Sequence, residues 1–355
     1  MTAGLSAVLQ ASAEGEFLEI TFADNTTSIG ATAITKGKPF TQTSSAAGGI
    51  ATLVTATTIA NNSKNDVNNA DNWSGAATPG NGDTVFFDDT DVAALYNLGS
   101  LSAITLTALN YLGSFTGNCG LPEINTDGTA YREYRPDYFA IGATTINIGD
   151  NSGTGSGRIK IDTAGVDTTI NCYSTGAPLE QDKEAFLWKG AGAGANVVNM
   201  FGGTMGVAIF GGESATINTM RMAGGSLRCG AGTTLATIDK TDGTLEIRSN
   251  ATTVTHKGGT LLTRLSAAIT TLTLPGGTVT HDSNGTITTL TVSNTGTIDF
   301  GTDPRPVTVT NCTLRSGATL IDRAGRVTFT NPISAPDGLN SIAVIRGGST
   351  NLQFS

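Results

Sequence analysis

Charged, aromatic, cysteine and histidine residues are all scarce in this chain of 355 residues. Only 14% of the residues are charged and 6% are aromatic, and there are 4 cysteines and 2 histidines. The cysteines lie far apart and form no Cys-x-x-Cys pair, so neither a zinc site nor a redox pair is indicated. We expect four small buried cysteines, two isolated surface histidines, and no metal ion or cofactor.

Basic residues are too few for a protein that binds nucleic acid. The chain has 20 Lys and Arg against 29 Asp and Glu, and its net charge is -9. Binding to a phosphate backbone needs a basic face, so no nucleic acid partner is expected. No run of 18 apolar residues occurs, and the first residues lack a basic stretch followed by an apolar one. The sequence therefore indicates neither a membrane span nor a secretory signal.

A repeat dominates what the sequence does contain. Six times between positions 203 and 298, a glycine precedes a Thr or Ser and then an apolar residue. These triplets begin at Gly203, Gly225, Gly243, Gly259, Gly277 and Gly296, at steps of 22, 18, 16, 18 and 19 residues. Short runs rich in Thr and Ile or Leu, such as 269–273 and 287–291, recur between them. A fixed period of this length is typical of a stacked-coil protein.

The polar and apolar residues alternate within each run. In the run 289–292, threonines alternate with Leu290 and Val292, as in a strand that buries one face and exposes the other. One coil has no core of its own, but coils stacked about 4.8 Å apart bury one another's apolar side chains. The sequence therefore predicts an all-β fold, a parallel β-solenoid with coils of about 18 residues, preceded by a small N-terminal β or extended region.

Four regions are predicted along the chain. They are an attachment arm at 1–70, a solenoid cap at 71–100 that contains Trp73, the coils at 101–330, and a closing strand and tail at 331–355. Two stretches that break the repeat, near 119–140 and 176–192, are predicted to be insertions that leave the solenoid at a coil corner.

The insertions hold the candidate contact residues. Tyrosine, tryptophan and arginine are favoured where proteins bind partners, and aromatic rings also stack on sugars. The candidate contacts to a partner or a glycan are Tyr131, Arg132, Tyr134, Arg135, Tyr138 and Trp188. The alternative is that these side chains only pack the insertions onto the flank of the solenoid.

Catalytic residues are not expected in the regular coils. Solenoids that cut polysaccharides need carboxylates that project from consecutive coils onto one face. The available groups, such as Asp239, Glu246 and Asp282, do not recur at the coil spacing. Four aspartates between positions 83 and 91 form an acidic turn, which we interpret as solvated rather than as a Ca²⁺ site. We therefore expect a protein that is not an enzyme.

One segment resembles a known group of proteins. Asn72-Trp73-Ser74, followed by the Pro-Gly-Asn-Gly-Asp-Thr-Val stretch at 79–85, resembles the segment ahead of the coils in autotransporter-like surface proteins and in bacteriophage virion β-solenoid proteins. Autotransporters add a signal peptide and a membrane barrel, so the phage type fits this chain better. The resemblance covers about 20 residues and the style of the repeat, and it carries no catalytic residue.

The resemblance implies a role as a structural virion protein that assembles in the host cytoplasm. It favours a capsid decoration or head-fibre protein, with a tail protein as the nearest variant. The expected partners are the major capsid or tail protein, through the N-terminal region, and sister subunits of a trimer, with a cell-surface glycan as a further candidate. No membrane partner is expected. The alternatives are a glycan-binding or glycan-cleaving tailspike and a bacterial surface adhesin.

Overall fold

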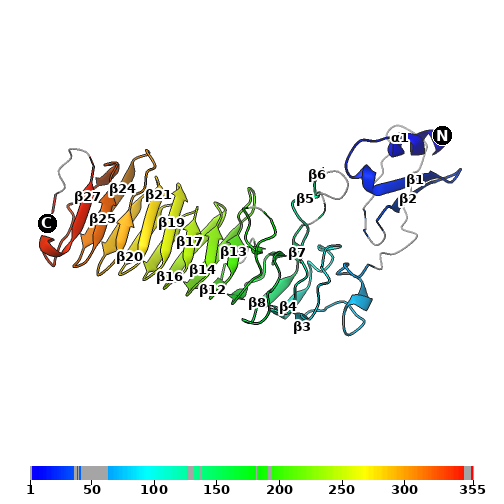
Figure 1. Cartoon of the computed structure of the whole chain (residues 1–355), viewed down its shortest axis with the longest axis horizontal. Coiled ribbons are helices and arrows are strands. Elements are labelled where there is room, and N and C mark those ends of the chain that lie inside the picture. Colours follow the sequence, from blue (N-terminus) through cyan, green and yellow to red (C-terminus); the bar gives the residue numbers. More distant parts are fainter. Residues whose placement is uncertain are drawn as a thin grey trace.

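The protein is a long rod of stacked coils with a small lobe at its N-terminal end, as the computed structural model in Figure 1 shows. The structure describes residues 2–35, 38, 40, 63–125, 131–133, 135, 137–180, 182–190, 194–347, 353 and 354. The lobe lies near the first coils, and the last coils lie at the opposite end of the rod (Figure 1).

Two parallel sheets run along the rod, with 12 and 11 strands among the described residues. From β8 onward, successive strands go alternately to one sheet and the other, so each coil supplies one strand to each. The 12-stranded sheet contains β3 (Thr84–Phe87), β4 (Thr105–Tyr111), β8 (Gly142–Ile148), β10 (Thr169–Cys172), β12 (Asn196–Met200), β14 (Ala215–Met222), β16 (Thr233–Lys240), β18 (Ala251–His256), β20 (Ile269–Leu274), β22 (Ile287–Val292), β24 (Val307–Leu314) and β26 (Val327–Phe329).

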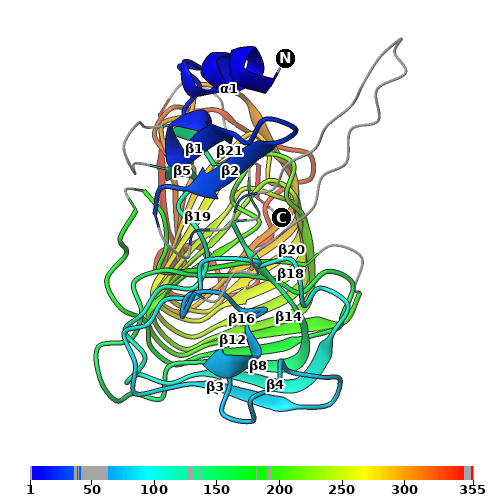
Figure 2. The ribbon, with the colours of Figure 1, turned by 90° about the vertical axis from the view of Figure 1, so that its right-hand side faces the viewer.

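The 11-stranded sheet closes the coils on the other side. It contains β7 (Phe139–Ala140), β9 (Ile159–Asp162), β11 (Phe186–Lys189), β13 (Thr204–Val207), β15 (Ser226–Cys229), β17 (Thr244–Ile247), β19 (Thr260–Leu265), β21 (Thr278–Ser283), β23 (Thr297–Asp299), β25 (Thr319–Asp322) and β27 (Ala343–Arg346). The view in Figure 2 shows the coils one behind another, displaced gradually from the first coils to the last. The predicted parallel β-solenoid is confirmed.

The predicted coil length holds in the middle of the rod and fails toward its start. Thr237 pairs with Thr253, 16 positions later, and Thr253 pairs with Thr271, 18 positions later. Asn110, by contrast, pairs with Asn147, 37 positions later, because the first insertion lies between them. The coils average about 21 residues.

The core consists of columns of like side chains that run along the rod axis. The register of the 12-stranded sheet places one residue per coil in such a column: Ile146, Ile170, Val198, Met220, Ile238, Val254, Leu272, Leu290 and Cys312. Every one of them is buried. All four cysteines are free thiols in the core, as predicted. Each coil therefore buries its apolar side chains against its two neighbours.

The glycine of each triplet forms the turn that leads into a strand of the 11-stranded sheet. Gly225, Gly243, Gly259 and Gly277 all have a φ between 70° and 81°, which is a left-handed conformation that favours glycine. A Cβ on Gly259 would lie 2.3 Å from the carbonyl oxygen of Gly243 in the preceding coil. The spacing of the triplets thus follows from close stacking of one turn on the next.

The N-terminal lobe and the cap precede the first coil. The lobe contains α1 (Thr2–Gln10), the 3-10 turn η1 (Phe17–Glu19) and an antiparallel hairpin of β1 (Ile20–Asp24) and β2 (Ile29–Ala33).

The cap begins with η2 (Ala70–Asn72), after which the Trp73 ring packs edge-on against Phe87 of β3 at 6.0 Å between centroids. The first solenoid strand, β3, thus lies inside the predicted cap. At the far end, η3 (Leu339–Ser341) leads into β27.

Candidate functional site

The two insertions meet on the outer side of the 11-stranded sheet, where β7, β9 and β11 are neighbours. The first insertion contains the short antiparallel pair β5 (Ile124–Asn125) and β6 (Tyr131–Arg132). Lys183 of the second insertion donates a hydrogen bond of 2.6 Å to Glu123 of the first, although 60 residues separate them. This bond is the largest cause of the lowered pKa of Glu123. The sequence indicates two separate insertions, and the structure brings them together.

A buried lysine lies beneath the insertions. The Lys160 side chain is fully buried, and its ammonium donates to the carbonyl of Leu121 at 2.9 Å. Its carboxylate partners are Glu180 at 3.2 Å and Asp137 at 3.9 Å. Burial lowers the pKa of Lys160 and raises the pKa of Asp137, while their mutual attraction opposes both shifts. Such a network fixes one arrangement of the insertions, because a buried charge that loses its partner is costly.

Further charged groups continue the network along the sheet. Burial raises the pKa of Glu213, whose nearest partners include the Tyr138 hydroxyl. The Lys189 ammonium lies 4.3 Å from the centre of the Tyr138 ring and 3.6 Å from Asp162. On the next coils, Glu184 accepts a hydrogen bond of 2.8 Å from Arg228 of β15. We define the insertion network as the charged residues Glu123, Asp137, Arg158, Lys160, Asp162, Glu180, Lys183, Glu184, Lys189, Glu213 and Arg228.

The predicted contact residues divide between surface and core. The Arg132 side chain is 76% exposed and pairs with Glu123 at 2.7 Å, so it is available on the surface. Arg135 is largely covered: it pairs with Glu133 at 2.7 Å, lies 3.9 Å from Glu19 of the lobe and lies over the Tyr96 ring. Arg135 therefore connects the lobe to the first insertion.

Two of the predicted contact residues belong to the interior. Trp188 is fully buried in β11 and donates from its ring nitrogen to the Thr163 hydroxyl at 3.0 Å. Tyr138 is also buried, under the insertion network. Neither ring can contact a partner or a sugar, because protein atoms already surround it. Tyr134 and the side chain of Tyr131 lie outside the described residues.

Both histidines are core residues, contrary to the prediction of isolated surface histidines. His256 stacks on the buried Lys240 of the preceding coil, and burial lowers the pKa of Lys240 to about 8 and that of His256 to about 4. His281 lies on the opposite sheet, where its Nδ1 is 2.7 Å from the Thr263 hydroxyl and burial lowers its pKa to about 4. The cause is the register, which places these positions in the inward-facing columns.

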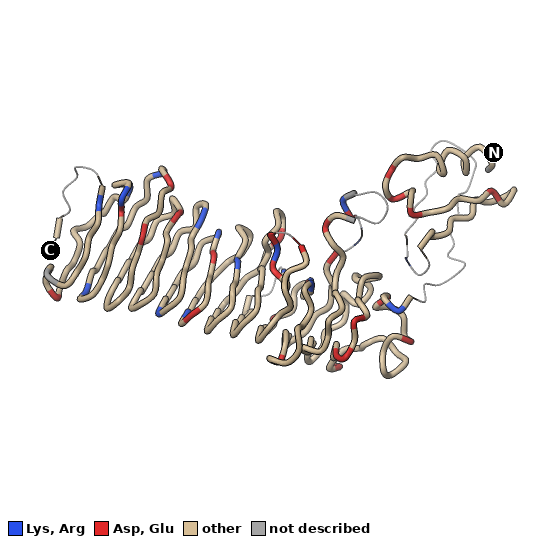
Figure 3. Tube along the Cα trace, viewed as in Figure 1, with Lys and Arg blue, Asp and Glu red and all other residues tan. Residues whose placement is uncertain are grey.

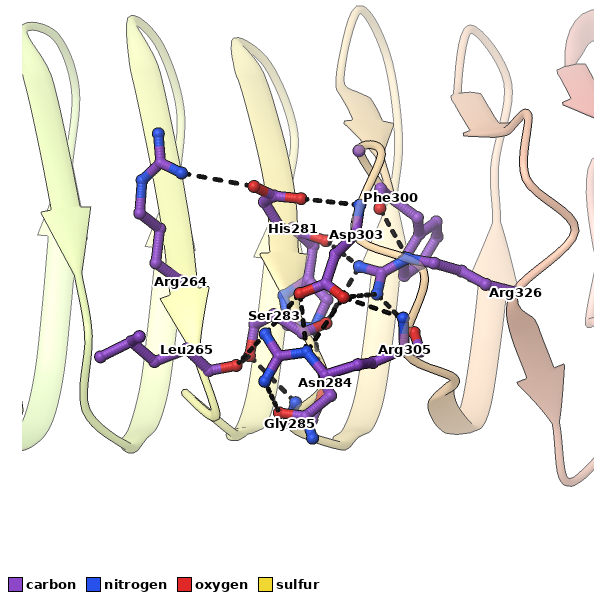
Figure 4. Close-up of polar contacts among 12 residues, drawn as sticks. Arg264, Leu265, His281, Ser283, Asn284, Gly285, Phe300, Asp303, Arg305 and Arg326 are labelled. Atoms are coloured by element: carbon purple, nitrogen blue, oxygen red, sulfur yellow. Dashed lines mark hydrogen bonds and ion pairs between the residues drawn. The ribbon is translucent and has the colours of Figure 1, made fainter.

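A buried arginine links the last coils to one another. Figure 4 shows the Arg326 guanidinium between neighbouring coils, where it donates to the carbonyls of His281 at 2.6 Å and Phe300 at 2.8 Å. It also donates to the carbonyl of Arg305 at 2.7 Å. Its backbone N–H donates to the Asp322 carboxylate. All these partners belong to the protein's own coils, so the cluster holds the coils together and offers no open ligand position.

The outer face of the 12-stranded sheet carries two kinds of polar column. Toward the start of the rod, four asparagines form a ladder in which three side-chain amides each donate to the asparagine of the preceding coil. The donors and acceptors are Asn147 to Asn110, Asn171 to Asn147 and Asn199 to Asn171, at 2.8 to 2.9 Å. Farther along, threonines take these positions and form no such bonds. Figure 3 shows charged residues scattered singly or in small groups along the coils, with uncharged residues between them.

The described residues contain neither a candidate metal site nor a candidate membrane-spanning helix. Among them, no group of three or more His, Cys, Asp and Glu side chains is placed to hold a metal ion. No helix in the same residues is long and apolar enough to span a membrane.

Comparisons with known proteins identify no family for this chain. No protein-family model, no curated protein and no solved structure matches this chain. The class that the structure establishes is a parallel β-solenoid of about 12 turns. The resemblance to phage virion proteins rests on residues 72–85 and on the repeat alone.

Proposed function

We propose that this chain is a non-enzymatic structural protein of a bacteriophage particle, a capsid decoration or head-fibre protein that projects a solenoid from the particle. The observation that supports this role is the uneven distribution of exposed apolar side chains. Among the described residues, four of the twelve exposed large apolar side chains lie in the short lobe, whereas the long run of coils from β12 to β24 exposes only two, Phe201 and Leu265. An attachment lobe and a shaft with little exposed apolar surface would differ in this way.

The lobe exposes apolar residues that a partner would cover. Leu5 and Val8 of α1 are 49% and 67% exposed, and Leu18 and Ile34 are 46% and 61% exposed. The helix α1 contains no charged residue. Contiguous exposed apolar surface marks a site of protein contact. We propose that this surface binds the major capsid or tail protein and sister subunits of a trimer, and that the virion is the protein's location.

Imaging tests the proposal directly. Purified source particles are imaged by negative stain with and without added protein, and sedimentation gives the mass of the free protein. The double variant Leu5→Glu with Val8→Glu should lose its place on the particle and sediment as a monomer. Leu265→Glu is the matched control, since Leu265 is 50% exposed but lies on the shaft. The proposal fails if the natural protein never appears on particles, or if both variants attach equally.

The insertion network supports a second candidate, a glycan-binding or glycan-cleaving tailspike. Burial raises the pKa of Asp137, Glu184 and Glu213, as a general acid on a sugar requires. Arg132, which is exposed and pairs with Glu123 of the same network, would contact the glycan. The test is incubation of the full chain with host surface polysaccharide. Release of oligosaccharides that Asp137→Asn abolishes would favour the tailspike over the decoration protein. Binding to intact host cells without particles would favour the adhesin.

A further inference from the structure

A regular grid of threonines covers part of the outer face of the 12-stranded sheet. The strands β18, β20 and β22 each carry a Thr-x-Thr triplet whose middle residue is buried, and the registers align the triplets. One column contains Thr253, Thr271 and Thr289, and the other contains Thr255, Thr273, Thr291 and, on β24, Thr313. We call these seven residues the threonine grid.

The backbone fixes the two spacings of the grid. Neighbouring strands lie about 4.8 Å apart, and side chains two residues apart on one strand are separated by about 6.6 Å. The buried middle residues Val254, Leu272 and Leu290 stack directly on one another, so the register cannot slip without exposing the core. The strands β18 to β24 follow one another in a nearly straight row (Figure 1). The hydroxyls therefore repeat at fixed distances in two directions.

Among the described residues, the hydroxyls of the grid have no hydrogen-bond partner. In the part of the chain that the structure describes, the threonine side chains of the grid form no hydrogen bond to other protein groups. Each is half-buried by its neighbours in the column, and a β-branched side chain has few rotamers to choose from. The asparagine ladder is different, because its amides satisfy one another. The grid thus presents ordered groups that can bond only to something outside.

The chemistry of the grid selects the kind of ligand. No charged or aromatic side chain occupies positions 252–255, 270–273 or 288–291. An ionic ligand or a stacked sugar ring would find nothing to hold it there. A fitting partner is uncharged, flat, and repeats in two perpendicular directions as the hydroxyls do. The prism surface of ordinary ice repeats along two perpendicular directions at lengths close to those of the grid.

We propose that the threonine grid is an ice-binding surface. The hydroxyls replace water molecules at the ice surface, and the methyl groups fill the spaces between them. Hydrogen bonds through ordered water are nearly as favourable as direct ones, and a pre-ordered face loses little entropy on binding. The inference does not depend on the virion role, since it uses only the coils β18 to β24.

The experiment is partition of the full chain into slowly growing ice, together with the shape and growth of single ice crystals in its presence. The natural protein should be enriched in the ice and should produce faceted crystals. Thr271→Lys, at the centre of the grid, should lower the fraction held in ice at least several-fold. Thr260→Lys is the matched control: Thr260 is an exposed strand threonine on the 11-stranded sheet, beside Leu262 rather than a second threonine column.

Circular dichroism shows whether each variant keeps its strands. If Thr271→Lys unfolds, Thr271→Val keeps the shape and removes one hydroxyl, and it should still weaken partition. The proposal is overturned if the natural protein is excluded from ice, or if the two lysine variants lose partition equally. It is also overturned if sedimentation shows that the natural protein self-associates and only Thr271→Lys is monomeric, because the grid would then be an interface between copies.

Discussion

The coils around β8 to β12 and those around β18 to β22 share one backbone arrangement but differ in how their polar side chains are satisfied. In the first set, asparagines bond along the axis, and the insertion network covers the opposite sheet. In the second set, half-buried threonines form no side-chain hydrogen bond to any described residue, and the inward columns include two histidines. The stacked core sets the fold in both, so the outer positions are free to differ in chemistry.

The largest expected effect concerns the buried charge in the first set. Lys160→Ala removes the ammonium that pairs with Glu180 and Asp137 and, among the described residues, leaves Glu180 with only the more distant Arg158, at 4.0 Å. The free energy of unfolding should fall by about 3 to 5 kcal/mol. Lys257→Ala is the control on the second set, where the exposed pair with Asp239 contributes about 0 to 1 kcal/mol. Denaturant unfolding followed by circular dichroism measures both, and equal losses would contradict the difference between the regions.

Acid should weaken the second set of coils before the first. The pKa of His281 is about 4 in the folded protein and about 6.5 in the unfolded chain. The contribution of neutral His281 to the free energy of unfolding is therefore complete above about pH 6.5. It is lost as the pH falls toward 4, and the loss reaches up to about 3 kcal/mol. The raised pKa values of Asp137 and Glu184 act in the opposite direction, because protonation removes a buried charge.

Hydrogen exchange measured strand by strand, corrected for intrinsic rates, tests this order. Between about pH 7 and pH 5, protection should fall in β19 and β21 while β9 and β11 keep theirs. His281→Asn should remove most of the pH dependence around β21. A uniform loss of protection along the whole rod would show that protonation of the histidines does not cause the loss.

The triplet glycines should matter more than glycines in the open loops. Gly259→Ala forces a left-handed residue and places its Cβ 2.3 Å from a backbone oxygen, and the conformation alone costs about 1 to 2 kcal/mol. Gly211→Ala meets no atom within 4 Å and should be nearly neutral. Thermal unfolding of the two variants provides the comparison, and similar midpoints would contradict the role assigned to the stacked turns.

The smallest effect separates the two polar columns of the outer face. Asn171→Ala breaks two bonds of the asparagine ladder and should cost about 1 kcal/mol. Thr271→Ala breaks no protein hydrogen bond and should cost only a few tenths of a kcal/mol. Denaturant midpoints of the two variants measure these losses of stability. A larger loss for Thr271→Ala would show that the threonine columns stabilise the fold more than the asparagine ladder does.

The sequence predicts the repeat well because every stacked coil must bury its apolar side chains against its neighbours in the same way. The triplet glycines and the alternation around Leu290 correctly indicate turns and strands. The same alternation, continued from Ile238 to Lys240 and from Val254 to His256, also indicates that these polar residues face inward. The prediction of surface histidines followed instead from the ordinary expectation that polar residues lie outside.

The insertions could not be predicted in the same way. Lys183 and Glu123 are 60 residues apart, and no local pattern indicates that they meet. Phe186, Leu187 and Trp188 form a strand buried on both faces, since the insertion network covers the outer side. Without alternation, this strand has the appearance of an aromatic loop in the sequence. The candidate contact surface was therefore predicted from composition, and burial removed two of its members.

The direction of the backbone hydrogen bonds has a mechanical consequence. In both sheets the bonds between strands run along the rod from one coil to the next. A pull on the two ends acts parallel to these bonds, so we expect the coils to separate one after another at modest force. A push along the same axis instead presses every coil against its neighbour. The rod should therefore resist compression along its axis better than extension.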